Sequence, residues 1–143
     1  MALATLAQIR SGLNTRLATI SGLQTYAYQP ADPPYPCAYV ASVGETTYHG
    51  SQQSGYMMWP VRVHVLVSQA PPAPESQADL DEFISPTGTN SIKAAIEGSG
   101  ASQTLSGIVA DCVVMATLGE QVFVSETGAF WGAEFLVHVH AGA

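Results

Sequence analysis

The sequence is poor in charged residues, and in positive ones above all. Only 10% of its 143 residues are charged, with four Lys or Arg against eleven Asp or Glu and a formal net charge of −7. An average soluble protein has roughly 25% charged residues. Because four cations cannot neutralise a phosphate backbone, we predict no tight nucleic-acid binding. An acidic surface can nevertheless line a passage for DNA. A surface with little charge also indicates that other subunits cover part of it.

Long apolar runs are missing as well. The opening stretch MALATLAQIRSGL is interrupted by Gln8, Arg10 and Ser11, so it lacks the continuous apolar core of a signal peptide. No window approaches the roughly 18 to 20 apolar residues that span a bilayer. We therefore predict no membrane partner and synthesis in the cytoplasm.

Cysteine is scarce, and the motifs of catalysis are absent. Cys37 and Cys112 lie far apart, each among strand-forming residues, which favours two buried free thiols over a disulfide or a metal site. The sequence has no Gly-x-Ser-x-Gly elbow, and residues 50–55, GSQQSG, have the wrong spacing for one. No glycine-rich loop has phosphate-binding spacing. We predict that the protein is not an enzyme and has no cofactor.

Three helices are expected. Apolar residues in the first part of the chain recur at spacings of three and four, which predicts an amphipathic helix that ends at Ser21-Gly22. Residues 75–84 have the composition of a short helix with a solvated acidic face, and residues 91–97 form another, capped by Asn90 or Ser91. The apolar stripe of the first helix consists of Leu3, Leu6, Ile9, Leu13, Leu17 and Ile20.

Strands are predicted from period-two patterns. Valines at 61, 63, 65 and 67 alternate with other residues and predict the strand 56–68, with Pro60 placing its start at an edge or bulge. Residues 24–28, 37–43, 108–118, 121–125 and 129–140 complete the set, and the last ones form a long hairpin with its turn at residues 126–128. Tyr56, Trp59, Phe130 and Trp131 are expected in core or cross-strand packing.

This order of elements defines the predicted fold class. It is α+β, a mixed and mainly antiparallel β-sheet with helices packed on one face, an N-terminal amphipathic helix and a C-terminal long β-hairpin. The length suits a single domain over residues 1–143.

One face of the sheet is expected to be unusually polar. Arg62, His64 and Leu66 on one strand and Glu134, Leu136, His138 and His140 on the last strand make a surface too polar for a core and too apolar for open water. We predict a subunit interface or a channel lining, with Arg62, His64, Glu134, His138 and His140 as candidates for this ring or lumen face. An alternative is a metal site, in which His138 and His140 would meet His64. We expect no metal, because no other ligand has suitable spacing.

Several segments, in their order, resemble one known family. They are LAQIRSGLNTRLATISGLQTYAYQP, the proline-rich loop with PCAYVASV, then WPVRVHVLVS, NSIKAAIE and FWGAEFLVHVHA. Together they cover most of the chain and resemble tail terminator proteins, also called tail completion proteins, of long-tailed bacteriophages of the siphovirus type. None of them is a catalytic motif, so the resemblance rests on the order of patterned structural segments.

The resemblance implies a structural virion protein. Its subunits would form a ring, a homohexamer, that caps the tail tube, ends tube growth and joins the tail to the head-tail connector, with DNA passing through the lumen without specific binding. The protein would be assembled in the host cytoplasm and reside at the head-proximal end of the tail. Residues 44–55 and 119–128 are the predicted contacts with neighbouring rings, with candidates Glu45, Tyr48, His49, Glu120 and Glu126.

Two alternatives stay open at this point. A head-to-tail adaptor or stopper protein of the same connector has a similar size and also forms rings. A small metal-binding or ligand-binding module would instead use the face of His64, His138 and His140.

Overall fold

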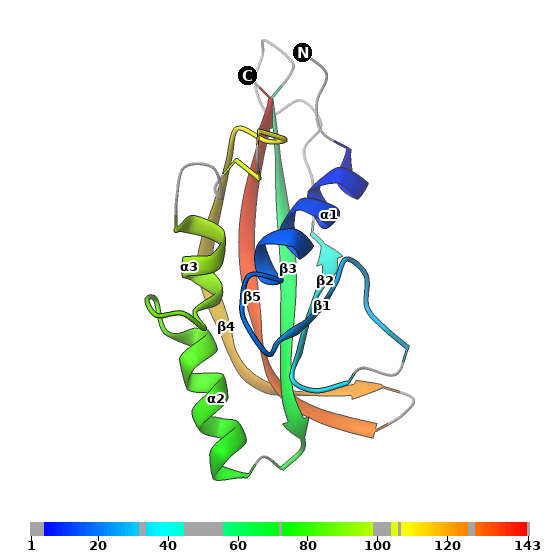
Figure 1. Cartoon of the computed structure of the whole chain (residues 1–143). Coiled ribbons are helices and arrows are strands. Elements are labelled where there is room, and N and C mark those ends of the chain that lie inside the picture. Colours follow the sequence, from blue (N-terminus) through cyan, green and yellow to red (C-terminus); the bar gives the residue numbers. More distant parts are fainter. Residues whose placement is uncertain are drawn as a thin grey trace.

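The computed structural model describes residues 5–31, 34–44, 56–71, 73–98, 104–105, 107–125 and 128–142. Figure 1 shows the elements in chain order. They are α1 (Leu6–Leu17), β1 (Gln24–Tyr26), β2 (Cys37–Val43), β3 (Tyr56–Gln69), α2 (Pro74–Ile84), α3 (Ile92–Glu97), β4 (Asp111–Ser125) and β5 (Gly128–Gly142).

The strands form one five-stranded sheet in the order β1-β2-β3-β5-β4. β1 pairs with β2 in parallel, and the other neighbours are antiparallel. The three helices lie on one side of this sheet (Figure 1) and share a core with it. The predicted α+β fold, the N-terminal helix and the C-terminal hairpin of β4 and β5 are confirmed.

Helix α1 is shorter than its apolar stripe predicts. Thr5 caps it, and Thr5 and Gln8 exchange side-chain to backbone hydrogen bonds in a capping box. The helix ends at Leu17, because the next amides bond three residues back: Thr19 N–H donates to the Arg16 carbonyl and Ile20 N–H to that of Leu17. The predicted stop at Gly22 is therefore wrong. Gly22, with φ of +81°, belongs to the turn that enters β1.

The alternation in β3 is confirmed. Val61, Val63, Val65 and Val67 are buried under the helices. Pro60 is the fifth residue of β3, and the start of this strand lies beyond the pairing with β2, at an edge as predicted. The pairing of β2 with β3 ends at Val61, so on the N-terminal side of that residue the described part of the chain pairs β3 with β5 alone in the ladder, and a residue without an N–H is tolerated there.

Strand β4 is continuous, where the sequence predicted two pieces starting at residue 108. Two register shifts, between Val114 and Ala116 and between Thr117 and Glu120, replace the predicted break. Gly119, with φ of +102°, lies in the second one and adopts a backbone conformation that favours glycine. Such bulges bend a strand, and the β4–β5 hairpin curves accordingly in Figure 1.

The two cysteines are free and buried. Burial raises the pKa of each thiol to about 12, so neither is a thiolate at neutral pH. Cys112 lies in the core under the helices, whereas Cys37 belongs to a smaller cluster on the opposite side of the sheet. The prediction of buried free thiols is confirmed.

Candidate functional site

The candidate site is the sheet face that points away from the helices, here called the open face. Successive residues of a strand point to opposite faces, so the partners of the buried valines lie here. The register places His64 opposite Glu134, Arg62 opposite Leu136 and Pro60 opposite His138. The five predicted ring or lumen residues, Arg62, His64, Glu134, His138 and His140, therefore share this face.

A second, smaller apolar cluster covers one end of the open face. Cys37, Tyr39, Leu66 and Phe130 are buried in it, and Tyr26, Ala41 and Phe123 pack against it. The curved hairpin supplies Phe130 from β5 and Phe123 from β4. The Phe123 ring centroid lies 4.5 Å from that of His64, so the hairpin end reaches over the middle of β3. Gly132 allows this approach, since a Cβ there would collide with the Val65 carbonyl oxygen.

A charged network lies beside this cluster. One carboxylate oxygen of Glu134 is 2.6 Å from Nη1 of Arg62, and the other is 2.6 Å from Nε2 of His64. Nδ1 of His64 is 3.1 Å from the Tyr39 hydroxyl. Both oxygens of Glu134 and both ring nitrogens of His64 thus have partners.

The network fixes the protonation of its members. Burial lowers the pKa of His64 and outweighs the hydrogen bond and charge of Glu134, which raise it, while Arg62 lowers it further. Neutral His64 then donates from Nε2 to Glu134 and accepts from the Tyr39 hydroxyl at Nδ1. Burial raises the pKa of Tyr39 to about 12, so this hydroxyl keeps its proton. The arrangement contains no activated nucleophile and acts as a structural clamp between β2, β3 and β5.

The three histidines of the alternative metal site do not meet. His138 and His140 lie four and six positions beyond Glu134 along β5, and their ring centroids are 6.5 Å apart. His64 is instead bonded to Glu134 and Tyr39. Within the described ranges, no group of three His, Cys, Asp or Glu side chains is placed to hold a metal ion. The arrangement that the alternative metal site requires, with His64 meeting His138 and His140, is therefore not formed by these residues.

All four Lys and Arg residues belong to the described part of the chain, and each is bonded within it. Arg10 donates to the carbonyls of Ala27, Val40 and Ala41 at 2.8 to 3.1 Å. Arg16 donates to the Ala95 carbonyl, Lys93 lies 2.7 Å from Glu97, and Arg62 pairs with Glu134. Acidic residues therefore dominate the field outside the molecule. They include four side chains on α2, Glu75, Asp79, Asp81 and Glu82.

Sequence reasoning missed Arg10 as an anchor. It sits next to the buried Ile9 on α1 and reaches past the helix to the backbone of β2 and of the segment after β1. The one available signal was a lone cation beside the apolar stripe of a chain with few cations. Tyr39 was also missed, because it lies in β2, whose sequence CAYVASV is almost entirely apolar.

Of the predicted contacts between rings, only Glu120 lies in the described residues; Glu45, Tyr48, His49 and Glu126 lie outside them. Glu120 is exposed on β4 and accepts a hydrogen bond of 2.6 Å from Nε2 of Gln77 on α2. Gln77 in turn accepts from the Trp131 indole. Trp59 and Trp131 pack against the core under the helices, as predicted, and the side chain of Tyr56 lies outside the description.

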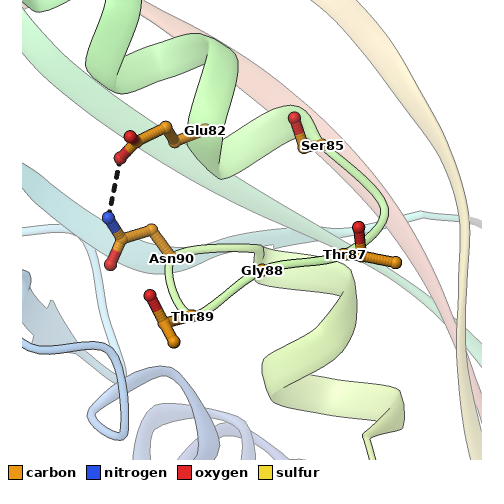
Figure 2. Close-up of a pocket in the computed structure, with 6 residues that line it drawn as sticks. All are labelled: Glu82, Ser85, Thr87, Gly88, Thr89 and Asn90. Atoms are coloured by element: carbon orange, nitrogen blue, oxygen red, sulfur yellow. Dashed lines mark hydrogen bonds between the residues drawn. The ribbon is translucent and has the colours of Figure 1, made fainter.

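A polar hollow lies where α2 meets the loop before α3 (Figure 2). It holds about 210 Å³, below the roughly 300 to 1,000 Å³ of small-molecule sites. Its single ionisable side chain, Glu82, accepts a hydrogen bond of 2.7 Å from Nδ2 of Asn90. The lining residues are Glu82, Ser85, Thr87, Gly88, Thr89 and Asn90.

The sequence matches no protein-family model and no curated protein in the comparisons made. No helix among the described residues is both long enough and apolar enough to cross a membrane.

Proposed function

We propose that this chain is a structural subunit of a phage virion. Copies of it form a ring that caps the tail tube, ends tube growth and joins the tail to the head-tail connector. The ordered segments that resemble tail terminator proteins support this proposal. The sheet with helices on one face is the fold that this resemblance implies.

The observation that carries the proposal is the internal bonding of every Lys and Arg. DNA must slide through the bore of such a ring, and free cations on its wall would hold the phosphates. Here Arg62, the cation of the open face, is paired with Glu134 at 2.6 Å. A wall built from this face would present no unpaired Lys or Arg to passing DNA.

The action is one of shape and symmetry. Identical head-to-tail contacts produce a closed ring when the rotation between subunits closes, and an open filament when it does not. A closed ring on the last layer of the tube ends growth because its outer surface does not repeat the tube surface. That outer surface then receives the connector.

Electron microscopy of the purified protein mixed with tail tubes of the same phage tests the proposal. We expect one extra ring of density at a single end of each tube, and no further tube growth when tube protein is added. Bare tube ends that keep growing would sink the proposal. In intact particles, density for this chain inside the connector would instead favour the adaptor or stopper.

DNA binding provides a second arm of the test. At about 0.15 M salt, fluorescence anisotropy should show no binding of duplex DNA by the free protein. Salt-sensitive binding in this assay would contradict the proposed lumen. A stoichiometric metal found in the purified chain would support the metal-binding alternative.

A further inference from the structure

Strand β4 exposes more large apolar side chains than any other element in the described residues. Met115, Leu118, Val122 and Val124 are exposed by 54%, 43%, 47% and 81%. Exposed apolar residues scattered singly are ordinary, but four on one strand make a candidate contact surface. β4 is also an edge strand of the sheet.

The two halves of β4 differ in the hydrogen bonds that their backbone amides make with side chains of the same chain. In the first half, Cys112 N–H donates to the Asp111 carboxylate and Val114 N–H donates to the Glu97 carboxylate of α3, at 2.9 and 2.7 Å. Such bonds close an edge against pairing with another chain. From residue 115 to 124, no backbone amide donates to a side chain of the described residues. The exposed apolar side chains all lie in this second half.

A second exposed apolar surface lies beside β1, where the Tyr28 ring lies 4.9 Å from the Arg10 guanidinium and the Tyr35 ring centroid lies 6.1 Å from that of Phe130. Tyr28, two residues after β1, is 61% exposed, and Tyr35 is 47% exposed. The segment of Tyr35 is held next to β1 because Gln24 N–H donates to the Pro36 carbonyl. Of the seven large apolar residues that are exposed in the described chain, six therefore lie on β4 or beside β1, and only Ile108 lies elsewhere.

Charge decides which partner fits these surfaces. All four cations of the chain are bonded internally, so a second copy offers no free Lys or Arg to the acids of α2. Contacts between copies must then use uncharged surface, and a basic partner would be drawn to α2 instead. The second half of β4 carries one charge, Glu120, which Gln77 already binds.

We propose that residues 115–124 of β4 in one copy pack against the surface of Tyr28 and Tyr35 in the next copy. The contact joins two different surfaces, so it is head-to-tail and can propagate around a ring. The closure of that ring rests on the proposed function, whereas the contact itself does not.

Three variants of the full-length chain test the contact. Leu118→Thr with Val124→Thr removes the β4 surface, and Tyr28→Thr with Tyr35→Thr removes its complement. Ile108→Thr is the matched control, since it removes an apolar side chain that is 39% exposed and belongs to neither surface. Circular dichroism and thermal unfolding verify that each variant is folded.

Sedimentation velocity over a range of concentrations measures association. We expect the wild type and Ile108→Thr to associate equally, and each double variant to need at least about tenfold more protein. Wild-type protein that stays monomeric at every concentration would overturn the proposal. So would equal association of the β4 variant and the control.

Mixing the two double variants tests the head-to-tail geometry. Each variant keeps one intact surface, so an equal mixture should form heterodimers and stop there. If copies instead meet β4 against β4, the tyrosine variant associates normally by itself and the mixture gains nothing, which overturns the proposal.

The tail-tube experiment separates this inference from the proposed function. Association through β4 without capping of tubes leaves the contact standing and removes the function. Capping of tubes by the β4 double variant as well as by the wild type leaves the function standing and removes the contact.

Discussion

The two faces of one sheet differ sharply, although the same strands build both. The face under the helices is filled by apolar side chains, with Val61, Val63 and Val65 of β3 meeting residues from all three helices. The open face has the Glu134 network in its middle and an aromatic cluster at one end. The chain therefore stabilises one face mainly by burial, and the other by a smaller apolar cluster together with a few specific polar bonds. The open face can therefore contact a partner while the domain stays folded.

Two neighbouring residues on β5 should differ most in how far their replacement lowers the free energy of unfolding. Phe135 is 1% exposed under the helices, and its replacement in Phe135→Ala should cost about 3 to 5 kcal/mol of unfolding free energy. Leu136→Ala, on the open face and only half-buried, should cost less than half as much. Urea unfolding followed by circular dichroism measures both. Equal losses would show that the open face is packed as tightly as the other.

Arg10 should give the next largest effect, because it ties α1 to the end of β2. Arg10→Ala leaves three backbone carbonyls without their donor and should cost roughly 2 to 3 kcal/mol. Arg16→Ala is the matched control, since Arg16 makes a single bond to the Ala95 carbonyl and should cost about 1 kcal/mol. The same urea titration compares them, and a larger loss for Arg16→Ala would refute the anchoring role.

Glu134→Gln probes the network itself. The amide cannot accept from both Arg62 and His64, and with Arg62 partly exposed the loss should be about 1 to 2 kcal/mol. Glu120→Gln changes the same atoms on exposed β4 and should stay within about 0.5 kcal/mol. Indistinguishable midpoints in urea for the two variants would mean that the network contributes nothing.

The smallest expected effect is a dependence on pH. The pKa of His64 is lowered in the folded state, so the unfolded chain binds more protons once pH falls below its ordinary value of about 6.5. The contribution of neutral His64 is complete above that pH and is lost as pH falls through the folded pKa. His64→Asn should therefore lose less stability than the wild type between about pH 7.5 and about pH 5.5.

His138→Asn is the control for this measurement. His138 lies on the same face of β5 but outside the Glu134 network, so its variant removes a histidine and leaves that network intact. If His138→Asn flattens the pH dependence of stability and His64→Asn does not, His64 is not the group that causes this dependence.

Local pattern was enough to predict much of this fold. The alternation around Val63, the stripe of Ile9, Leu13 and Leu17, and the cap at Ser91 each act within a few residues, so the sequence shows them directly. The common face of Arg62, His64 and Glu134 also followed from the period of the strands.

Register and bulges were not predictable in the same way. The distance of His138 from His64 depends on which residue of β5 faces His64, and that is set by the whole hairpin. Strand β4 is continuous because two bulges accommodate the region around Gly119, where the sequence predicted a break. Arg10 reaches carbonyls 17 to 31 residues away, and no local pattern encodes those partners.

The placement of the four cations has a further consequence for proteolysis. Trypsin cleaves after Lys and Arg, and the whole chain offers only Arg10 and Arg16 in α1, Arg62 in β3 and Lys93 in α3. Each site lies inside a helix or strand, so its peptide bond becomes accessible only when that element opens. Trypsin should therefore leave the chain intact for as long as the domain stays folded.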